Sequence, residues 1–246
     1  MIDPTSGRTA EDDNIAHAEP AFPSELLIWL SPAFPVGSFA YSQGLETAIE
    51  HKFVVDPATL ATWIMALVDT GSLRTDLQIL SLAFRADAAR VGEINALALA
   101  LQPSRERYDE TRTQGKAFWQ AYAAAWQEKG AAMDTSSPAR PGHGAGDDIA
   151  LPVAVGLAAG RRGLPLAATL DAYGVAAITN LVSAAIRLGV AGQFDGQRVL
   201  AQLMGPLRAV CVVARSVCEA DIGAATFMAD IASLQHETQV TRLFRS

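Results

Sequence analysis

Apolar residues recur at helical spacing through most of this chain, and no long stretch shows the alternation of apolar and polar residues that a half-buried strand needs. The clearest stripe follows Asp56 and Pro57, residue types favoured at the cap and in the first turn of a helix. Five apolar side chains fall there at i, i+3, i+4, i+7 and i+8: Leu60, Trp63, Ile64, Leu67 and Val68. The pattern predicts an all-α protein.

Other stripes extend this prediction along the chain. Aromatic residues are spaced for one helix face from Phe118 to Trp126, after a break at Pro103 and Ser104. We predict Asp195 as the N-cap of a later helix, an interruption at 205–206, and a further helix that buries both cysteines and runs through the second. These cysteines are Cys211 and Cys218.

Two segments lack helical periodicity. Residues 1–22 are polar and acidic, and residues 130–149 are rich in Gly, Ala, Ser and Pro. The rest of a chain of 246 residues with 50% hydrophobic content is large enough to bury a sizeable core. We therefore predict a single compact multi-helix domain over residues 23–246, with a disordered N-terminal tail over 1–22 and a flexible loop at about 130–149.

Charge and composition exclude several classes of function. A net charge of −7 and a pI near 5.1, without a basic run interleaved with aromatics, argue against binding nucleic acid. The first 20 residues contain no apolar segment of a secretory signal. The most apolar long window, residues 172–192, contains Asn180 and Arg187 and several glycines, which favours a buried helix over a membrane span. We expect a soluble, cytoplasmic protein that binds no membrane.

The chain contains no recognisable catalytic motif. A phosphate-binding loop, a nucleophile elbow, a Cys-x-x-Cys pair and a His-Glu-x-x-His pair are all absent from the sequence. Adjacent His236 and Glu237 are residue types that ligate divalent metals, but two neighbours do not make a site. We therefore predict no enzyme, no catalytic residues, no cofactor and no metal site.

A first motif, SPAFPVGSFAYSQGLE, occupies residues 31–46. Its prolines must stop a short helix over 25–30, because proline lacks an amide donor and holds its predecessor extended. We predict that a helix reopens at 37–38, with Phe39 and Tyr41 on its packed face. The chemistry alone allows two interpretations: a rigid corner whose tyrosine hydroxyl is satisfied internally, or a corner that organises a protein interface.

A second motif, HETQVTRLFRS, occupies residues 236–246. It places Leu243 and Phe244 between Arg242 and Arg245, although a chain end frays unless it is docked. Either the segment folds back onto its own helices, or it orders against a partner while its arginines pair with carboxylates. We predict the second.

Together the two motifs resemble the UreF family of urease accessory proteins, and the resemblance extends less sharply over about 26–246. It implies an all-helical, non-catalytic chaperone that works as a homodimer. Its expected partners are a UreD/UreH-type accessory protein, the GTPase UreG and apo-urease. It would recruit and regulate the GTPase on the UreD/UreH-type protein during nickel insertion, and nickel would be held by the partner proteins.

The resemblance also implies the partner-binding residues. Arg187, in an apolar helix, has two open interpretations: it snorkels or bridges to a carboxylate, or it presents a cation where the GTPase docks. Whether such contact activates or restrains the GTPase stays open. The expected partner-binding residues are Tyr41, Glu46, Arg187, Gln193, His236, Glu237, Arg242, Leu243 and Phe244.

Other functions compete with this interpretation. A passive structural scaffold would bind the same partners without changing GTP hydrolysis. A nickel-binding chaperone would need clustered His, Cys or carboxylate ligands. A helical enzyme would bury titratable residues with shifted pKa values in a pocket, and the scarcity of histidine and lysine argues against it.

Overall fold

The computed structural model describes residues 22–126 and 148–246. Within these ranges the regular elements are helices, without a strand, which confirms the predicted fold class. The predictions for 1–22 and 130–149 fall almost entirely outside the described residues. The helices are α1 (Ser24–Trp29), η2 (Ser38–Ala40), α2 (Leu45–Glu50), α3 (Pro57–Asp69), α4 (Ser72–Arg85), α5 (Val91–Ala100), α6 (Arg105–Ala125), α7 (Leu151–Arg161), α8 (Leu166–Arg187), α9 (Gln193–Ala214), η3 (Glu219–Asp221) and α10 (Phe227–His236).

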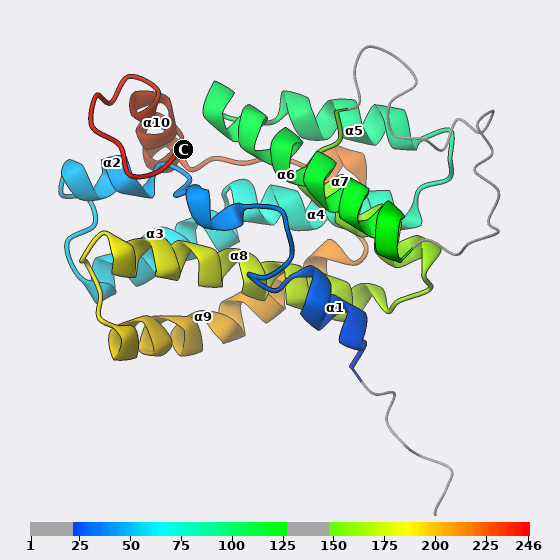
Figure 1. The fold of residues 1–246 in the computed structure, drawn as a ribbon, viewed down its shortest axis with the longest axis horizontal. Helices are drawn as coiled ribbons and strands as arrows, with labels where there is room; N and C mark the ends of the chain where they lie inside the picture. The colour runs from blue at the N-terminus through cyan, green and yellow to red at the C-terminus, as the bar shows by residue number, and fades with distance from the viewer. Residues whose placement is uncertain (1–21, 127–147) are drawn as a thin grey trace, which may run out of the picture.

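Helix α4 is at the centre of the packing. It contacts α3, α5, α7, α8 and α9, and its most extensive contact is with α7. Helix α6 packs on α7, while α8 and α3 both pack on α9. Figure 1 shows α10 and the end of the chain beside α2 at one end of this helical body. The fold therefore brings the last helix, α10, against α2 from the early part of the chain.

Glycines allow α7 to approach α4 closely. A Cβ atom added at Gly156 would lie 2.5 Å from the carbonyl oxygen of Leu80, and one at Gly160 would lie 2.7 Å from that of Phe84. Both distances are far below van der Waals contact, and the obstacle is helix backbone that cannot move aside. The central packing therefore requires glycine on this face of α7.

Helix α8 is long and apolar enough, by length and composition, to cross a membrane. Half of its most apolar 18-residue window is buried within the protein, where α8 packs chiefly on α9 and α4. The burial agrees with the expectation of a core helix.

Two predicted boundaries in the later helices are wrong. The N-cap of α9 is Gly192, and Asp195 pairs with Arg198 one turn on, at 2.5 Å. Pro206 lies inside α9 without ending it. Because proline has no N–H group, the carbonyl of Gln202 loses its donor within the helix, but Gln202 is on an exposed part of α9.

The two cysteines also differ from expectation. Helix α9 ends at Ala214, so Cys218 lies beyond it and is exposed, and its thiol contacts Asp221 at 2.9 Å. Cys211 is buried as predicted, and burial raises the pKa of its thiol to about 12. The prediction of a buried pair therefore holds only for Cys211.

The corner after α1 contains less helix than the sequence pattern predicts. A single 3-10 turn covers 38–40, and the next α-helix begins only at Leu45. Gln43 and Gly44 both have positive φ, 58° and 78°, which interrupts a right-handed helix. Phe39, expected on a packed face, is 68% exposed, whereas Tyr41 is buried as expected.

We predict that Gly156→Ala lowers the free energy of unfolding by about 1–3 kcal/mol, because the new methyl group overpacks the contact between α7 and α4. Urea unfolding followed by circular dichroism measures the change. Gly92 on α5 has open space around it, so Gly92→Ala is the matched control and should be neutral or slightly stabilising. Equal stability of the two variants would contradict the close approach.

Candidate functional site

The last residues of the chain return across α2, and we call residues 242–246 the tail. The carboxylate of Glu46, on α2, accepts hydrogen bonds from the main-chain amides of Leu243 at 2.7 Å and Phe244 at 3.0 Å. Glu46 is only 8% exposed. Because this buried carboxylate accepts two main-chain hydrogen bonds from the tail, Glu46 is an anchor for the tail.

His236, the last residue of α10, lies between two carboxylates. Its Nδ1 is 2.6 Å from a carboxylate oxygen of Glu106 on α6, and its Nε2 is 3.2 Å from Glu46. The other oxygen of Glu106 accepts a hydrogen bond from Arg242 in the tail at 2.6 Å. The imidazole is completely buried. Glu46, Glu106, His236 and Arg242 therefore form one cluster, which we call the carboxylate–histidine cluster.

Arg187, the last residue of α8, holds the tail from the other side. Its guanidinium lies 4.3 Å from the centre of the Phe244 ring and donates a hydrogen bond to the carbonyl of Phe39. Phe244 is 4% exposed beneath this contact. Cation–π contacts of this kind contribute about 0.5–2 kcal/mol. Arg187 therefore joins α8, the corner after α1 and the tail.

The final residues are fixed by further hydrogen bonds. The amide and hydroxyl of Ser42 donate to the main-chain oxygen of Ser246, at 2.6 and 2.5 Å. The hydroxyl of Ser246 donates to Glu110 at 2.9 Å, and the amide of Arg245 donates to the carbonyl of Ala40 at 2.8 Å. The chain's own residues therefore provide a docking site for this segment, and its ordering against a partner stays a prediction.

Helix α10 is held against the same end of the molecule. Glu237 accepts a hydrogen bond from the amide of Arg105, the first residue of α6, at 2.8 Å. A carboxylate there also complements the positive end of the helix dipole. A Cβ atom added at Gly44 would lie 2.8 Å from the main-chain nitrogen of Ser233, so α10 contacts the start of α2 directly.

The structure brings most of the expected partner-binding residues to this site and divides them by exposure. Those that are buried cannot contact a partner directly in this docked form: Tyr41, Glu46, His236 and Phe244. Those that reach the surface are Arg187, Arg242 and Leu243, with Glu237 half-buried. Gln193 is exposed at the start of α9 and lies outside this cluster of contacts.

Three residues of this site were not predicted from the sequence: Ser42, Glu106 and Glu110. Glu106 lies in the first turn of α6, after the N-cap Ser104, and an acidic residue there is ordinary helix chemistry. Glu110 pairs with Arg107, three residues earlier on the same helix, and such pairs are typical of a solvated helix face. Only their burial beside residues more than 120 positions away distinguishes them.

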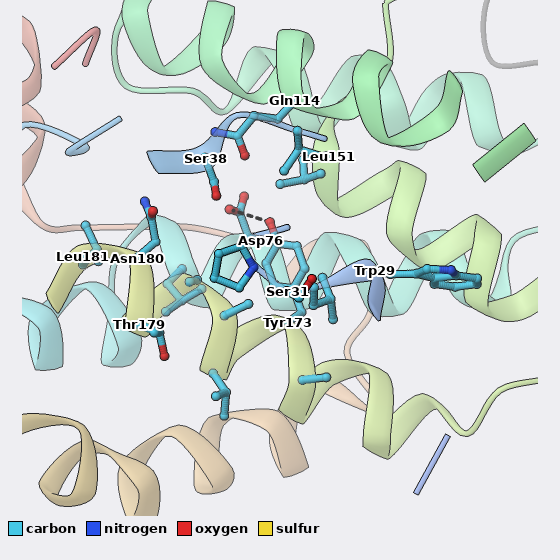
Figure 2. A pocket seen from close by; sticks show the side chains of 18 of the residues that line it. Trp29, Ser31, Ser38, Asp76, Gln114, Leu151, Tyr173, Thr179, Asn180 and Leu181 are labelled. Carbon is cyan, nitrogen blue, oxygen red and sulfur yellow. Dashed lines mark hydrogen bonds between the residues drawn. The ribbon is translucent and has the colours of Figure 1, made fainter. Parts of the chain in front are cut away.

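A cavity of about 610 Å³ lies next to the tail, between α1, α4, α6, α8 and α9. Figure 2 shows Asp76 within this cavity, where its carboxylate accepts a hydrogen bond from the hydroxyl of Tyr173. Ser38 and Gln114 lie on one side of it, and Trp29 lies at one end (Figure 2). Glu110 lines this cavity and also binds Ser246. The docked tail and the cavity wall therefore share a carboxylate.

Several ionisable side chains that line the cavity are buried, among them Arg107 and Glu110. Burial raises the pKa of Asp76 to about 6, against the lowering effects of Arg107 and of the hydrogen bond from Tyr173. Burial, followed by Asp76, raises the pKa of Tyr173 well above its ordinary value. Arg107 and Glu110 form a buried ion pair. A carboxylate with a shifted pKa is one feature of a catalytic site, but the lining residues include no His, Cys or Lys to act with it.

The described residues contain no group of three or more His, Cys, Asp or Glu side chains arranged to hold a metal ion. In the carboxylate–histidine cluster, the imidazole itself occupies the space between the two carboxylates and contacts each with a different nitrogen. This arrangement serves to dock the tail.

We predict that Glu46→Ala releases the tail. Each lost hydrogen bond to a charged group is worth about 1.5–3 kcal/mol, so the amides of Leu243 and Phe244 should exchange with solvent at least about tenfold faster. Hydrogen–deuterium exchange followed by NMR measures this. Glu50→Ala, on the exposed side of the same helix, is the control and should leave both amides protected. Unchanged protection in Glu46→Ala would contradict the anchor.

We predict a pH dependence of stability from Asp76. Its folded pKa of about 6 exceeds the ordinary 3.8, so ionisation destabilises the folded state as pH rises from about 4 to 6, by about 2–3 kcal/mol in total. Asp76→Asn should therefore be more stable than the wild type at pH 7.5, and the difference should vanish near pH 4. Urea unfolding at several pH values tests this.

The control for that series is Asp69→Asn, at an exposed position, which should show no such trend. A constant stability difference across the pH range would show that Asp76 does not carry the ionisation penalty.

Comparisons with known proteins identify the family. A family model described as UreF matches residues 54–204. The urease accessory protein UreF of Xanthobacter autotrophicus is 46% identical over 225 residues, which is 90% of this chain and 90% of that protein. The urease accessory protein UreF of Bradyrhizobium diazoefficiens is 43% identical over 246 residues, 98% of this chain and 99% of that protein. The chain therefore belongs to the UreF family of urease accessory proteins.

Proposed function

We propose that this protein is a non-catalytic, cytoplasmic chaperone of urease maturation. In this proposal it binds a UreD/UreH-type accessory protein and the GTPase UreG as a homodimer, regulates the GTPase, and supports nickel insertion into apo-urease. The nickel is held by the partner proteins, and this chain supplies the recognition surfaces. The proposal rests on membership of the family and on the docked tail.

The single observation that carries the recognition role is the two-sided tail. Phe244 and Ser246 are buried and fix the tail, whereas Leu243 and Arg245 between and beside them are exposed. Leu243 is 58% exposed although it is large and apolar. An apolar side chain on a rigid backbone loses little conformational entropy when a partner covers it. The outer side of the tail is therefore suited to bind another protein.

Arg187 extends this surface. The guanidinium of Arg187 donates to the carbonyl of Phe39 and stacks on the ring of Phe244. These two contacts fix it at the end of α8, while the residue stays exposed. A guanidinium offers five N–H donors, so a partner carboxylate or phosphate can still be bound. A fixed cation of this kind could act on the GTPase, in either direction, or could serve only to orient the tail.

The competing functions differ in measurable ways. A passive scaffold binds both partners and leaves the rate of GTP hydrolysis unchanged. A nickel-binding chaperone binds nickel tightly and stoichiometrically by itself, which equilibrium dialysis of the isolated chain detects.

We predict that Leu243→Asp abolishes assembly with the UreD/UreH-type and GTPase partners. The substitution places a charge on the exposed side of the tail and keeps the main-chain amide that binds Glu46, so the fold and the docked tail should persist. Complex mass measured by light scattering, with the GTP hydrolysis rate measured in the same samples, tests the proposal. A mutant that assembles like the wild type would exclude this surface.

The matched control is Val213→Asp on α9, where the wild-type side chain is also 58% exposed. It introduces the same charge away from the tail and should leave assembly unchanged. Assembly without any change in GTP hydrolysis would favour the passive scaffold over the regulator.

A further inference from the structure

The cavity between α1, α4, α6, α8 and α9 has the size and the lining of a small-molecule site. Its volume of about 610 Å³ lies within the range of about 300–1,000 Å³ that is usual for ligand pockets. Leu27 and Phe39 line it and are 64% and 68% exposed, so the cavity reaches the surface beside them. The deeper lining is largely apolar and includes Leu26, Phe118 and Leu207. A ligand that enters would therefore bury an apolar body.

The charged side chains of the lining leave one negative charge in excess. Three carboxylates and two guanidinium groups are among the described lining residues: Asp76, Glu110 and Asp171, with Arg107 and Arg208. In the buried part, Arg107 forms its ion pair with Glu110. Asp76 accepts a hydrogen bond from the neutral hydroxyl of Tyr173 at 3.2 Å. Asp76 is therefore the carboxylate whose charge is least compensated.

The pKa of Asp76 agrees with this charge balance. Burial raises it to about 6, against the lowering effects of Arg107 on α6 and of the hydrogen bond from Tyr173 on α8. Glu110, also on α6, raises it further. A desolvated carboxylate is stabilised by any cation that comes close to it. The electrostatics of the cavity therefore favour a positively charged ligand.

Amide oxygens on the walls of the same cavity suit the donors of such a ligand. Figure 2 shows Gln114 and Asn180 on these walls together with Asp76. Gln114 donates its amide nitrogen to Glu110 at 3.0 Å, and Asn180 donates its own to the carbonyl of Tyr41 at 3.3 Å. Their side-chain oxygens are left to accept hydrogen bonds. An ammonium group, with three N–H donors and no acceptor, complements a carboxylate flanked by such oxygens.

We propose that this cavity is a binding site for a small organic monocation, whose primary ammonium group pairs with Asp76 and whose apolar body fills the space lined by α1 and α9. The apolar lining favours an organic cation over a strongly hydrated inorganic ion, because the organic body gains by leaving water. The described lining residues lie between Phe22 and Arg208, so they do not include the tail. This site goes beyond the proposed function and does not depend on it, because binding is measured without any partner protein.

Binding should depend on pH through the carboxylate. An alkyl ammonium group, like that of lysine, titrates near pH 10.4 and stays charged at neutral and acidic pH. With its pKa of about 6, Asp76 is about one-tenth ionised at pH 5 and almost fully ionised at pH 7.5. Apparent affinity falls in proportion to the fraction that is competent to bind. The cation should therefore bind about tenfold more weakly at pH 5 than at pH 7.5.

The test is isothermal titration calorimetry of the full-length chain with hexylammonium and with 1-hexanol, a neutral molecule of the same length. At pH 7.5 the amine should bind at least about tenfold more tightly than the alcohol, because only the amine pairs with the buried carboxylate. In NMR spectra, the methyl groups of Leu26 and Leu207 should shift on addition of the amine. Equal affinity for the two probes, or no binding of the amine, would overturn the proposal.

Asp76→Asn is the decisive variant, because it keeps the shape of the side chain and removes the charge. It should bind the alcohol as the wild type does, and it should lose both the preference for the amine and the pH dependence. Asp69→Asn, at an exposed position, is the control and should bind both probes as the wild type does. A wild-type preference for the amine in Asp76→Asn would also overturn the proposal.

A second variant tests the position of the site without changing its charge. Ala176 lines the cavity from α8, and Ala176→Phe fills part of the space beside Asp76. Both probes should then bind at least several fold more weakly, while circular dichroism shows that the helices are retained. Wild-type affinity for the amine in Ala176→Phe would place binding outside this cavity and contradict the assignment.

Discussion

The arrangement of this molecule depends on the need to pair buried carboxylates. Glu46, on α2, and Glu110, on α6, are both less than 10% exposed in a body whose other buried side chains are mainly apolar. A buried charge without a partner destabilises a protein by several kcal/mol. Their partners come from Arg107 and from α10 and the tail, so the end of the chain completes the charge balance of helices near its beginning. The tail is therefore part of the fold.

Much of the helical body can be predicted from local sequence. The stripe after Asp56 corresponds to α3, where Asp56 caps the helix and accepts from the amide of Thr59 at 2.8 Å. Capping and periodicity act over a few residues, so the sequence displays them directly. The errors arise where local rules conflict with context. Pro206 would end a helix on local grounds, yet α9 continues because tertiary packing of its apolar face outweighs one lost hydrogen bond.

The two segments that form the candidate site could be predicted from the sequence, but the contacts and exposure of their residues could not. The two motifs do meet in space, and Ser42 of the first binds Ser246 of the second. Their exposure could not be predicted, because the pairing of His236 with Glu46 and Glu106 joins residues 190 and 130 positions apart. No local sequence pattern distinguishes an acidic residue that faces solvent from one that contacts a histidine far away in the sequence. The cavity beside Asp76 likewise exists only through the packing of several helices.

The two interpretations of the tail that the sequence leaves open are compatible once its geometry is known. Phe244 and Ser246 are directed inward, while Leu243 and Arg245 are directed outward. Folding back onto the protein therefore does not remove the tail as a binding surface, because inward residues fix the backbone that presents the outward ones. Changes to inward residues should act through the position of the tail, and changes to outward residues should act on recognition alone.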